Sequence, residues 1–309
     1  MNKNGPSQKE SQPPKRIIVL GVMRSGTSLT ADLARLWGAY AGSQDELWTS
    51  DASDPRGYGY MEYIPLQNLN NQLLDDNDRV PPTRESLDQK TSTQKYKRQA
   101  KELLKNMDDL TQKKRMPGWV WKDARLPLTL PFWNGLWGDA IYVVTIRHPA
   151  EIALSLAKAA EIDQDNIPYS AGFIYWQYCM LEILSFTQNS PRKIFIAYDQ
   201  LINNPLRECT RLCDFLDEQC GKSKRDVQKR LGTMLPRVAK NQRHQSYQKF
   251  LADMPQVTRE QRALYDFLRV KIHYPDEAYN VDDFALYAGW REYLESVDML
   301  MSLQGARDM

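Results

Sequence analysis

Four short apolar runs constrain the fold of this chain more than any other feature of its sequence. They lie at 16–21 (RIIVLG), 119–122 (WVWK), 141–146 (IYVVTI) and 193–198 (KIFIAY). The first, third and fourth are almost continuously apolar, a pattern typical of strands buried on both faces of a parallel sheet. Stretches with helical character lie between and after these runs, at 27–37, 150–160 and 205–216. We therefore predict an α/β domain of three layers, with a central, mainly parallel sheet flanked by helices.

The remaining segments are a polar tail and two helical regions. Residues 1–15 lack the apolar core of a secretory signal, and we interpret them as a disordered tail. We expect residues 16–309 to form one domain. Within it, the polar stretch at about 75–116 predicts a helical cap or lid, although a surface insertion without a role is the alternative. The region from about 245 to 309 predicts a helical C-terminal extension.

The charge and cysteine content limit the partners of the chain. Lysine and arginine number 41 and aspartate and glutamate 39, so the net charge is only +2. Bulk electrostatics thus favours neither nucleic acid nor a membrane surface as a partner. No apolar run approaches the roughly 20 residues of a membrane span. The 4 cysteines are too few for a disulfide framework and form no ligand-like cluster with histidine, so we expect a cytoplasmic protein without a metal site.

The sharpest local motif is the segment at 21–29 (GVMRSGTSL), directly after the first apolar run. A strand, a tight loop with glycines and a helix N-terminus together present backbone N–H groups and a favourable helix dipole to an anion. Thr27 and Ser28 add hydroxyl donors at the helix start. The segment predicts a phosphate-binding loop; the alternative is an ordinary turn with a serine N-cap.

This loop departs from the P-loop of ATPases and kinases. That motif places a lysine directly after its second glycine, where this chain has Thr27, and the cation lies inside the loop as Arg24. The third apolar run ends in Arg147 and not in an aspartate that could hold Mg²⁺. The pattern therefore favours a nucleotide neutralised by side-chain cations without a metal.

A second anion site is predicted at the end of the third apolar run. Arg147 closes the run, and Ser155 follows eight positions later, two turns into the next helix. Such an arginine and serine can converge on one phosphate. Taken singly, Arg147 could form a structural salt bridge and Ser155 could be a packing residue. Together with the loop, they predict a nucleotide with phosphates at two separate places.

With these motifs, the chain resembles the sulfotransferases that use 3′-phosphoadenosine-5′-phosphosulfate (PAPS), over most of residues 16–244. The resemblance implies a P-loop-like fold, PAPS as co-substrate, 3′,5′-adenosine bisphosphate as product, and no metal. In it, Arg147 and Ser155 hold the 3′-phosphate, and Tyr198, in a segment similar to Y-E-D-L, lies near the adenine. The implied 5′-phosphosulfate loop, with an arginine in place of the more common lysine, consists of Arg24, Ser25, Gly26, Thr27 and Ser28.

Three further segments resemble the bacterial branch of that family. Residues 54–62 (DPRGYGYME) are similar to N-P-x-G-x-x-E with two extra residues, and 121–126 (WKDARL) to W-K-D-P-R-L with alanine for proline. Arg243 and His244 match an R-H pair, which implies that Arg243 contacts the cofactor. The K-x-x-H-x-x-N segment of the animal cytosolic branch is not found, so its catalytic histidine has no counterpart here. Natural-product tailoring enzymes of secondary metabolism are among the candidates.

The chemistry of sulfuryl transfer suggests roles for these residues. The protein must position the reactants and stabilise charge on the leaving 5′-phosphate. We assign Arg24 to that phosphate and Lys122 to the sulfuryl oxygens, although Lys122 could instead pair with a neighbouring carboxylate. Candidates for the base that accepts the acceptor's proton are Glu62, Asp123, His148 and His244, of which we favour Glu62.

Two other functions remain open from the sequence. One is a nucleotide or small-molecule kinase with a degenerate P-loop, which the missing loop lysine and strand-end aspartate disfavour. The other is a non-catalytic nucleotide-binding module, which the full set of cations and carboxylates disfavours. The acceptor is a small molecule in our interpretation, and both oxygen and nitrogen nucleophiles are compatible with the sequence.

Overall fold

The computed structural model describes residues 13–48, 59–77, 81–82, 84–159, 169–222, 226–241, 257–273, 279 and 281. Within them, four strands form one parallel sheet in the order β4-β1-β5-β6. The strands are β1 (Lys15–Leu20), β4 (Gly118–Lys122), β5 (Ile141–Ile146) and β6 (Lys193–Ala197). These bounds agree with the four predicted runs to within one residue at every end. The predicted parallel α/β sheet is confirmed.

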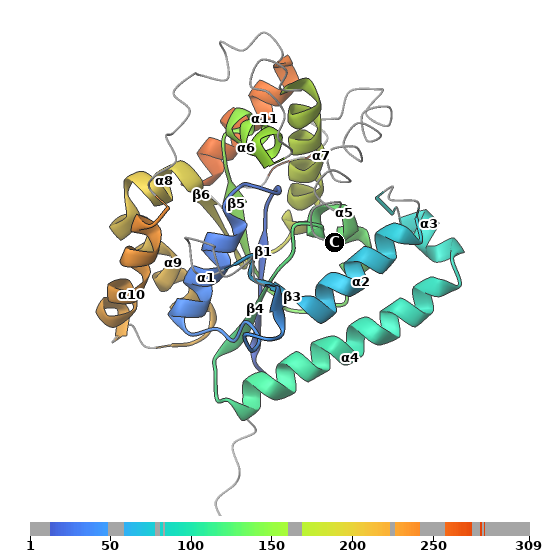
Figure 1. Cartoon of the computed structure of the whole chain (residues 1–309), viewed down its shortest axis with the longest axis horizontal. Helices are drawn as coiled ribbons and strands as arrows, with labels where there is room; N and C mark the ends of the chain where they lie inside the picture. Colours follow the sequence, from blue (N-terminus) through green and yellow to red (C-terminus); the bar gives the residue numbers. More distant parts are fainter. Residues whose placement is uncertain are drawn as a thin grey trace, which may run out of the picture.

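Helices cover both faces of this sheet (Figure 1). Their bounds are α1 (Thr27–Trp37), α2 (Ile64–Asp75), α3 (Arg84–Gln89), α4 (Ser92–Lys113), α5 (Leu126–Trp133), α6 (Pro149–Ala159), α7 (Tyr169–Thr187), α8 (Tyr198–Asn203), α9 (Pro205–Gln219), α10 (Val227–Ala239) and α11 (Arg259–Lys271). A short antiparallel ribbon of β2 (Leu47–Trp48) and β3 (Glu62–Tyr63) lies outside the main sheet. The helices predicted at 27–37, 150–160 and 205–216 correspond to α1, α6 and α9.

Alternate residues of each strand serve two different cores. In β1, Ile17 and Val19 pack with α1, α9 and α10 on one face, whereas Ile18 and Leu20 pack with α2, α4, α5 and α7 on the other. All four side chains are at most 1% exposed. Burial on both faces explains why the strand sequences are apolar without alternation.

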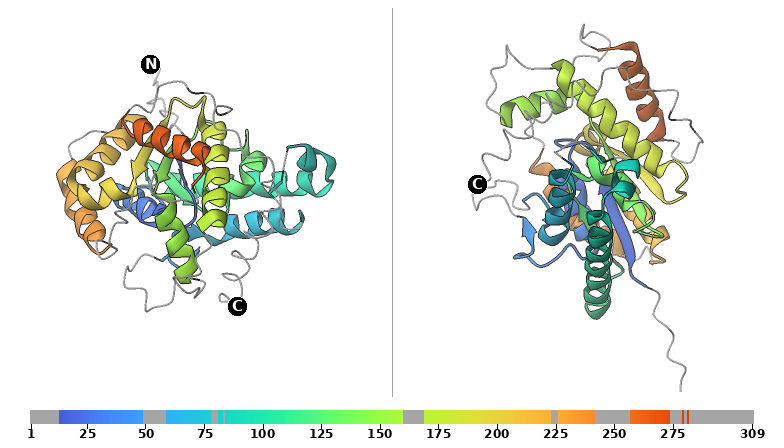
Figure 2. Two further views of the ribbon diagram at one scale, coloured as in Figure 1. Left: turned by 90° about the horizontal axis from the view of Figure 1, so that it is seen from above. Right: turned by 90° about the vertical axis from the view of Figure 1, so that its right-hand side faces the viewer.

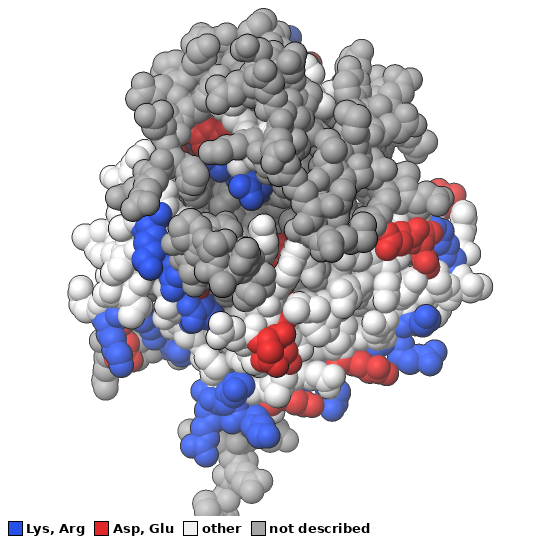
Figure 3. Space-filling model, in the orientation of Figure 1, with Lys and Arg blue, Asp and Glu red and all other residues white. Residues whose placement is uncertain are grey.

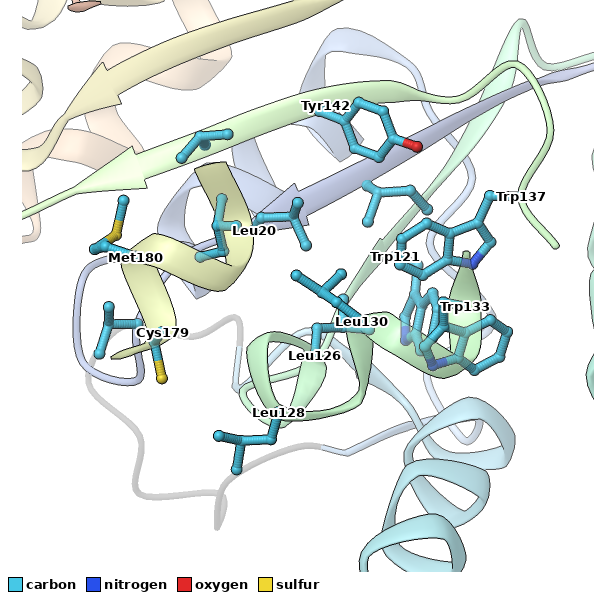
Figure 4. Close-up of a cluster of buried hydrophobic side chains, with 14 of the residues drawn as sticks. Leu20, Trp121, Leu126, Leu128, Leu130, Trp133, Trp137, Tyr142, Cys179 and Met180 are labelled. Carbon is cyan, nitrogen blue, oxygen red and sulfur yellow. The ribbon is translucent and has the colours of Figure 1, made fainter. Parts of the chain in front are cut away.

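Tryptophans fill the second of these cores (Figure 4). The Trp121 ring from β4 meets the Trp133 ring of α5 edge-on at 4.7 Å, and Trp133 stacks on Trp137 at 5.4 Å. Aromatic pairs of this kind add about 0.5–1.5 kcal/mol beyond the area that they bury. They fix α5, which directly follows the site residues at the end of β4.

The polar stretch predicted as a helical cap contains α3 and α4. The apolar side of α4 lies against α2 and β4, with Leu104 and Met107 buried in the main core. Its other side is charged, and acidic and basic side chains alternate along the face where α4 lies (Figure 3). Trp119 and Arg16 both donate hydrogen bonds to Asp108 of α4. These contacts make α4 an integral layer of the domain.

In the predicted C-terminal helical region, the described residues include α11, which lies across α7 (Figure 2). A capping box starts this helix, in which Thr258 and Gln261 bond each other's backbone N–H. Within the part of the chain that the structure describes, no helix combines the length and apolar character needed to cross a membrane.

Candidate active site

In the loop between β1 and α1, the space at Gly21 is too small for a side chain. A Cβ atom on Gly21 would lie 2.7 Å from the Ser25 hydroxyl and would overlap the Thr145 hydroxyl. Those two hydroxyls are 2.8 Å apart, and Thr145 also donates to the carbonyl of Leu20. Ser25 is therefore held by β5, at the carboxyl edge of the sheet, where ligands of α/β proteins usually bind.

The second loop glycine brings the start of α1 against Tyr198. Gly26 is the N-cap residue of α1 and has a φ of 98°, a conformation that favours glycine. A Cβ there would overlap the Tyr198 ring, with its Cε2 atom at 3.0 Å. Thr27 is buried and Ser28 half-buried in the first turn of α1. The backbone at the N-terminus of α1 thus forms a narrow cradle beside Tyr198.

Arg24 joins this loop to the second predicted anion site. Its φ of 67° is left-handed. Its Nε donates to the Ser155 hydroxyl at 2.9 Å, and its carbonyl accepts from Nη1 of Arg147 at 2.8 Å. The structure therefore brings together three residues that the sequence assigns to nucleotide phosphates.

Arg147 is oriented by two further groups. Its Nε donates at 2.7 Å to Glu151, which lies in the first turn of α6. Its guanidinium lies over the Tyr198 ring, 4.5 Å from the ring centroid, a cation–π arrangement. These contacts fix the guanidinium before any ligand binds, which lowers the entropy cost of binding an anion.

Lys122 and Glu62, the two residues predicted to act on the reacting groups, form an ion pair. Lys122 ends β4 and lies beside Val19 near the end of β1. Its ammonium binds Oε1 of Glu62, and the two side chains are 4% and 2% exposed. Both residues thus lie near the carboxyl ends of the strands, where the phosphate loop also lies. Lys122 pairs with a carboxylate, which was the alternative to its predicted role in binding sulfuryl oxygens.

Glu62 has three further contacts. The backbone N–H of Ala124 donates to Oε1 at 3.2 Å, and Gln67 of α2 donates to Oε2 at 2.9 Å. Nη1 of Arg125 lies 3.4 Å from Oε2. Because both carboxylate oxygens accept hydrogen bonds, Glu62 can accept a proton only after one of these contacts is released.

Asp123 is held in the same cluster. It accepts hydrogen bonds from Asn70 at 2.7 Å and from the backbone N–H of Arg125 at 2.8 Å, and Nη1 of Arg125 lies at 3.2 Å. Burial raises the pKa of the Asp123 carboxyl, against the lowering effect of the Arg125 guanidinium, and the Glu62 carboxylate adds to the increase. Asn70 in turn accepts hydrogen bonds from Thr129 and Trp133, which lock its orientation.

Comparison with known protein families gives a match to the sulfotransferase family over residues 14–220. The chain belongs to the sulfotransferase family. The match covers more than half of the chain and contains the site residues described in this section. The resemblance to sulfotransferases seen in the sequence is confirmed. Comparison with the curated proteins gives no match.

Solved structures of sulfotransferases are also similar to this sulfotransferase. The domain from the Synechococcus PCC 7002 olefin synthase is 16% identical, with coverage of 94% of this chain and 96% of that one and a TM-score of 0.41. The domain from the curacin biosynthetic pathway is 16% identical, with 93% and 99% coverage and a TM-score of 0.38. Sulfotransferase STF1 from Mycobacterium tuberculosis H37Rv is 14% identical, with 74% and 77% coverage and a TM-score of 0.37.

The other base candidates of this sulfotransferase occupy different positions. Nδ1 of His148 accepts from the backbone N–H of Ala150, and its ring meets Tyr265 of α11 edge-on at 5.2 Å. Burial lowers the pKa of His148. Arg243, His244 and residues 54–58 lie outside the described residues. Among the described residues, no group of three or more His, Cys, Asp or Glu side chains is arranged to hold a metal ion.

Two amide residues of the site were missed by sequence reasoning. Gln67 and Asn70 lie three residues apart on α2, hence on the same side of the helix, and contact Glu62 and Asp123 respectively. The available signal was their position shortly after the 54–62 motif, on a segment whose neighbouring leucines predict a buried helix face.

Proposed function

We propose that this sulfotransferase takes a sulfuryl group from PAPS and transfers it to a hydroxyl or nitrogen of a small-molecule acceptor, releasing 3′,5′-adenosine bisphosphate. One observation carries the proposal: Arg24, in the loop that leads into α1, donates to Ser155 and accepts from Arg147. Two anion sites at one sheet edge suit a nucleotide with phosphates at both ends.

The residues of the nucleotide side fit such a ligand. A Cβ at Gly26 would fill the cradle beside Tyr198, so glycine lets a ligand approach the backbone there. We assign the loop N–H groups to the 5′ end, together with the residues of the implied phosphosulfate loop: Arg24, Ser25, Gly26, Thr27 and Ser28. We assign Arg147 and Ser155 to the 3′-phosphate and Tyr198 to the adenine side, and Arg243 remains a predicted cofactor contact.

The reacting side consists of Lys122 and Glu62. PAPS supplies an activated sulfuryl group when bound. In our proposal, Lys122 binds its oxygens, Arg24 stabilises charge on the leaving phosphate, and Glu62 accepts the proton of the acceptor. Each role requires the ion pair between the two residues to separate, since their charges are now directed at each other. Gln67 and the Ala124 N–H keep Glu62 in place when Lys122 moves.

The acceptor and the cellular context complete the proposal. We expect a small metabolite, with bacterial natural products as candidates, and a reaction in the cytoplasm. Screening metabolite pools with PAPS for a sulfate-sized mass gain would identify the acceptor.

Calorimetry tests the nucleotide assignment without an acceptor. We expect 3′,5′-adenosine bisphosphate to bind far more tightly than ATP in the presence of EDTA. A preference for ATP, or binding that requires Mg²⁺, would contradict the proposal and favour a kinase.

A further inference from the structure

Helix α11 contacts two distant segments of the site through side chains that lie one turn apart. Nη1 of Arg269 donates to both carboxylate oxygens of Asp199, at 2.8 and 2.9 Å. The Tyr265 ring meets the His148 ring edge-on, with 5.2 Å between the two centroids. Because Tyr265 precedes Arg269 by one helical turn, both side chains lie on the same side of α11. This side of the helix thus contacts the segment after β5 and the segment after β6.

Each of these segments carries a residue that we assign to the nucleotide. His148 directly follows Arg147 after β5, and Asp199 directly follows Tyr198 after β6. The two assigned residues also contact each other, since the Arg147 guanidinium lies 4.5 Å from the centroid of the Tyr198 ring. A shift of one segment relative to the other would separate this pair. α11 therefore joins the two parts of the chain on which the nucleotide side depends.

The core fixes the position of α11. Leu264 and Leu268 are buried in the core that also contains α7. The Tyr265 ring meets the Trp176 ring of α7 with 6.2 Å between the centroids. The helix is thus a firm support for the side chains that extend from it toward the nucleotide side.

We propose that Arg269 is a positioning residue of the nucleotide site, which holds Tyr198 in place through Asp199. This inference rests on the proposed function, in which Tyr198 lies on the adenine side. In this role Arg269 does not touch the nucleotide. It fixes the start of α8, so that the Tyr198 ring keeps its place between Gly26 and the Arg147 guanidinium. A ring that is already in place lowers the entropy cost of binding.

The exposure of the ion pair separates this role from a purely structural one. The side chains of Arg269 and Asp199 are 34% and 35% exposed, and an ion pair as exposed as this contributes little to the stability of a protein. Loss of the pair should therefore weaken nucleotide binding more clearly than it lowers the free energy of unfolding.

Calorimetry with 3′,5′-adenosine bisphosphate and urea unfolding of the same variants test the inference. Arg269→Met and Asp199→Asn should each raise the Kd by about three- to tenfold, while the free energy of unfolding stays nearly unchanged. The double variant should bind no more weakly than the weaker single variant, because the two residues act as a unit. Arg269→Lys should recover part of the affinity, since one nitrogen of Arg269 makes both bonds to Asp199.

Arg192→Met is the matched control. Arg192 is exposed to a similar degree and pairs with Asp139, but this pair lies at the amino ends of β5 and β6. The substitution should leave the Kd within about twofold of that of the unmodified protein.

Three results would overturn the inference: a Kd of Arg269→Met within about twofold of the unmodified protein, single effects that simply add in the double variant, or an equal loss of affinity in Arg192→Met. If the unmodified protein does not prefer 3′,5′-adenosine bisphosphate to ATP, the proposed function itself fails. Circular dichroism checks folding, and Asp199→Asn and Arg269→Lys carry the test if Arg269→Met does not fold.

Discussion

Replacing Lys122 with methionine is expected to destabilise the protein by about 3 kcal/mol. The substitution keeps an unbranched side chain of similar length but removes the charge that faces Glu62, in a pair whose side chains are 4% and 2% exposed. Breaking a buried pair in this way costs about 3–5 kcal/mol in general. The lower end applies because Gln67 at 2.9 Å and the Ala124 N–H at 3.2 Å still bind the remaining carboxylate.

Urea unfolding followed by circular dichroism measures the change in the free energy of unfolding. In a thermal melt of a chain of this size, 3 kcal/mol corresponds to a decrease in Tm of about 5 °C. Combining Lys122→Met with Glu62→Gln removes both charges and should recover about 1–2 kcal/mol relative to the sum of the single variants. Lys105→Met is the matched control: Lys105 pairs with Asp109 at 3.0 Å on α4, but the two side chains are 76% and 59% exposed. An exposed pair of this kind contributes less than about 1 kcal/mol.

The reasoning is refuted if Lys122→Met costs no more than Lys105→Met. It is also refuted if the effects of Lys122→Met and Glu62→Gln simply add, because independent residues show no coupling. Either result would mean that the two charges do not depend on each other in the folded protein.

Three other substitutions test the nucleotide site and the base. Gly26→Ala should weaken binding of 3′,5′-adenosine bisphosphate by about tenfold or more, because its Cβ would overlap Tyr198 at a φ of 98°; Gly232→Ala, where nothing lies within 4 Å, is the calorimetric control. Arg147→Ala should cost about 1.5–3 kcal/mol of binding and abolish the preference for a 3′-phosphate; a preference that survives intact would make Arg147 structural. Glu62→Gln should keep nucleotide affinity while turnover falls by roughly 10²–10⁴; near-normal turnover would move the base role elsewhere.

The sheet could be predicted from the sequence because its strands are buried on both faces. Residues such as Ile17 and Ile18 serve opposite cores, so every position in the strand must be apolar. The same burial on all sides prevented the prediction of α7. It is buried along most of its length, and a helix that is apolar all round has no period by which to recognise it. α5 was hidden by Pro127 and Pro131, which usually indicate a loop.

The identities of the site residues could be predicted, but their contacts could not. Glu62 and Lys122 could be selected from their motifs because a carboxylate suits a base and a lysine suits an anion. The local sequence does not indicate that the two side chains, 60 positions apart, bind each other. Gln67 and Asn70 have no chemical signature of their own. Their amides can bind Glu62 and Asp123 only because the fold places α2 beside the end of β4.

The two ends of the site differ in how their charges are balanced. Beside the loop, Arg147 binds the carbonyl of Arg24 and pairs with Glu151, whereas at the end of β4 two cations face two carboxylates. We expect the first arrangement to bind a nucleotide and the second to act only when its pairs rearrange. Lys122 can bind sulfuryl oxygens only after it leaves Glu62, and the same movement exposes a Glu62 oxygen to the acceptor. Glu62→Gln should therefore change turnover even with a neutral amine acceptor, which needs little help from a base. If turnover with an amine acceptor is unaffected by this substitution, Glu62 acts only as a base and does not control the position of Lys122.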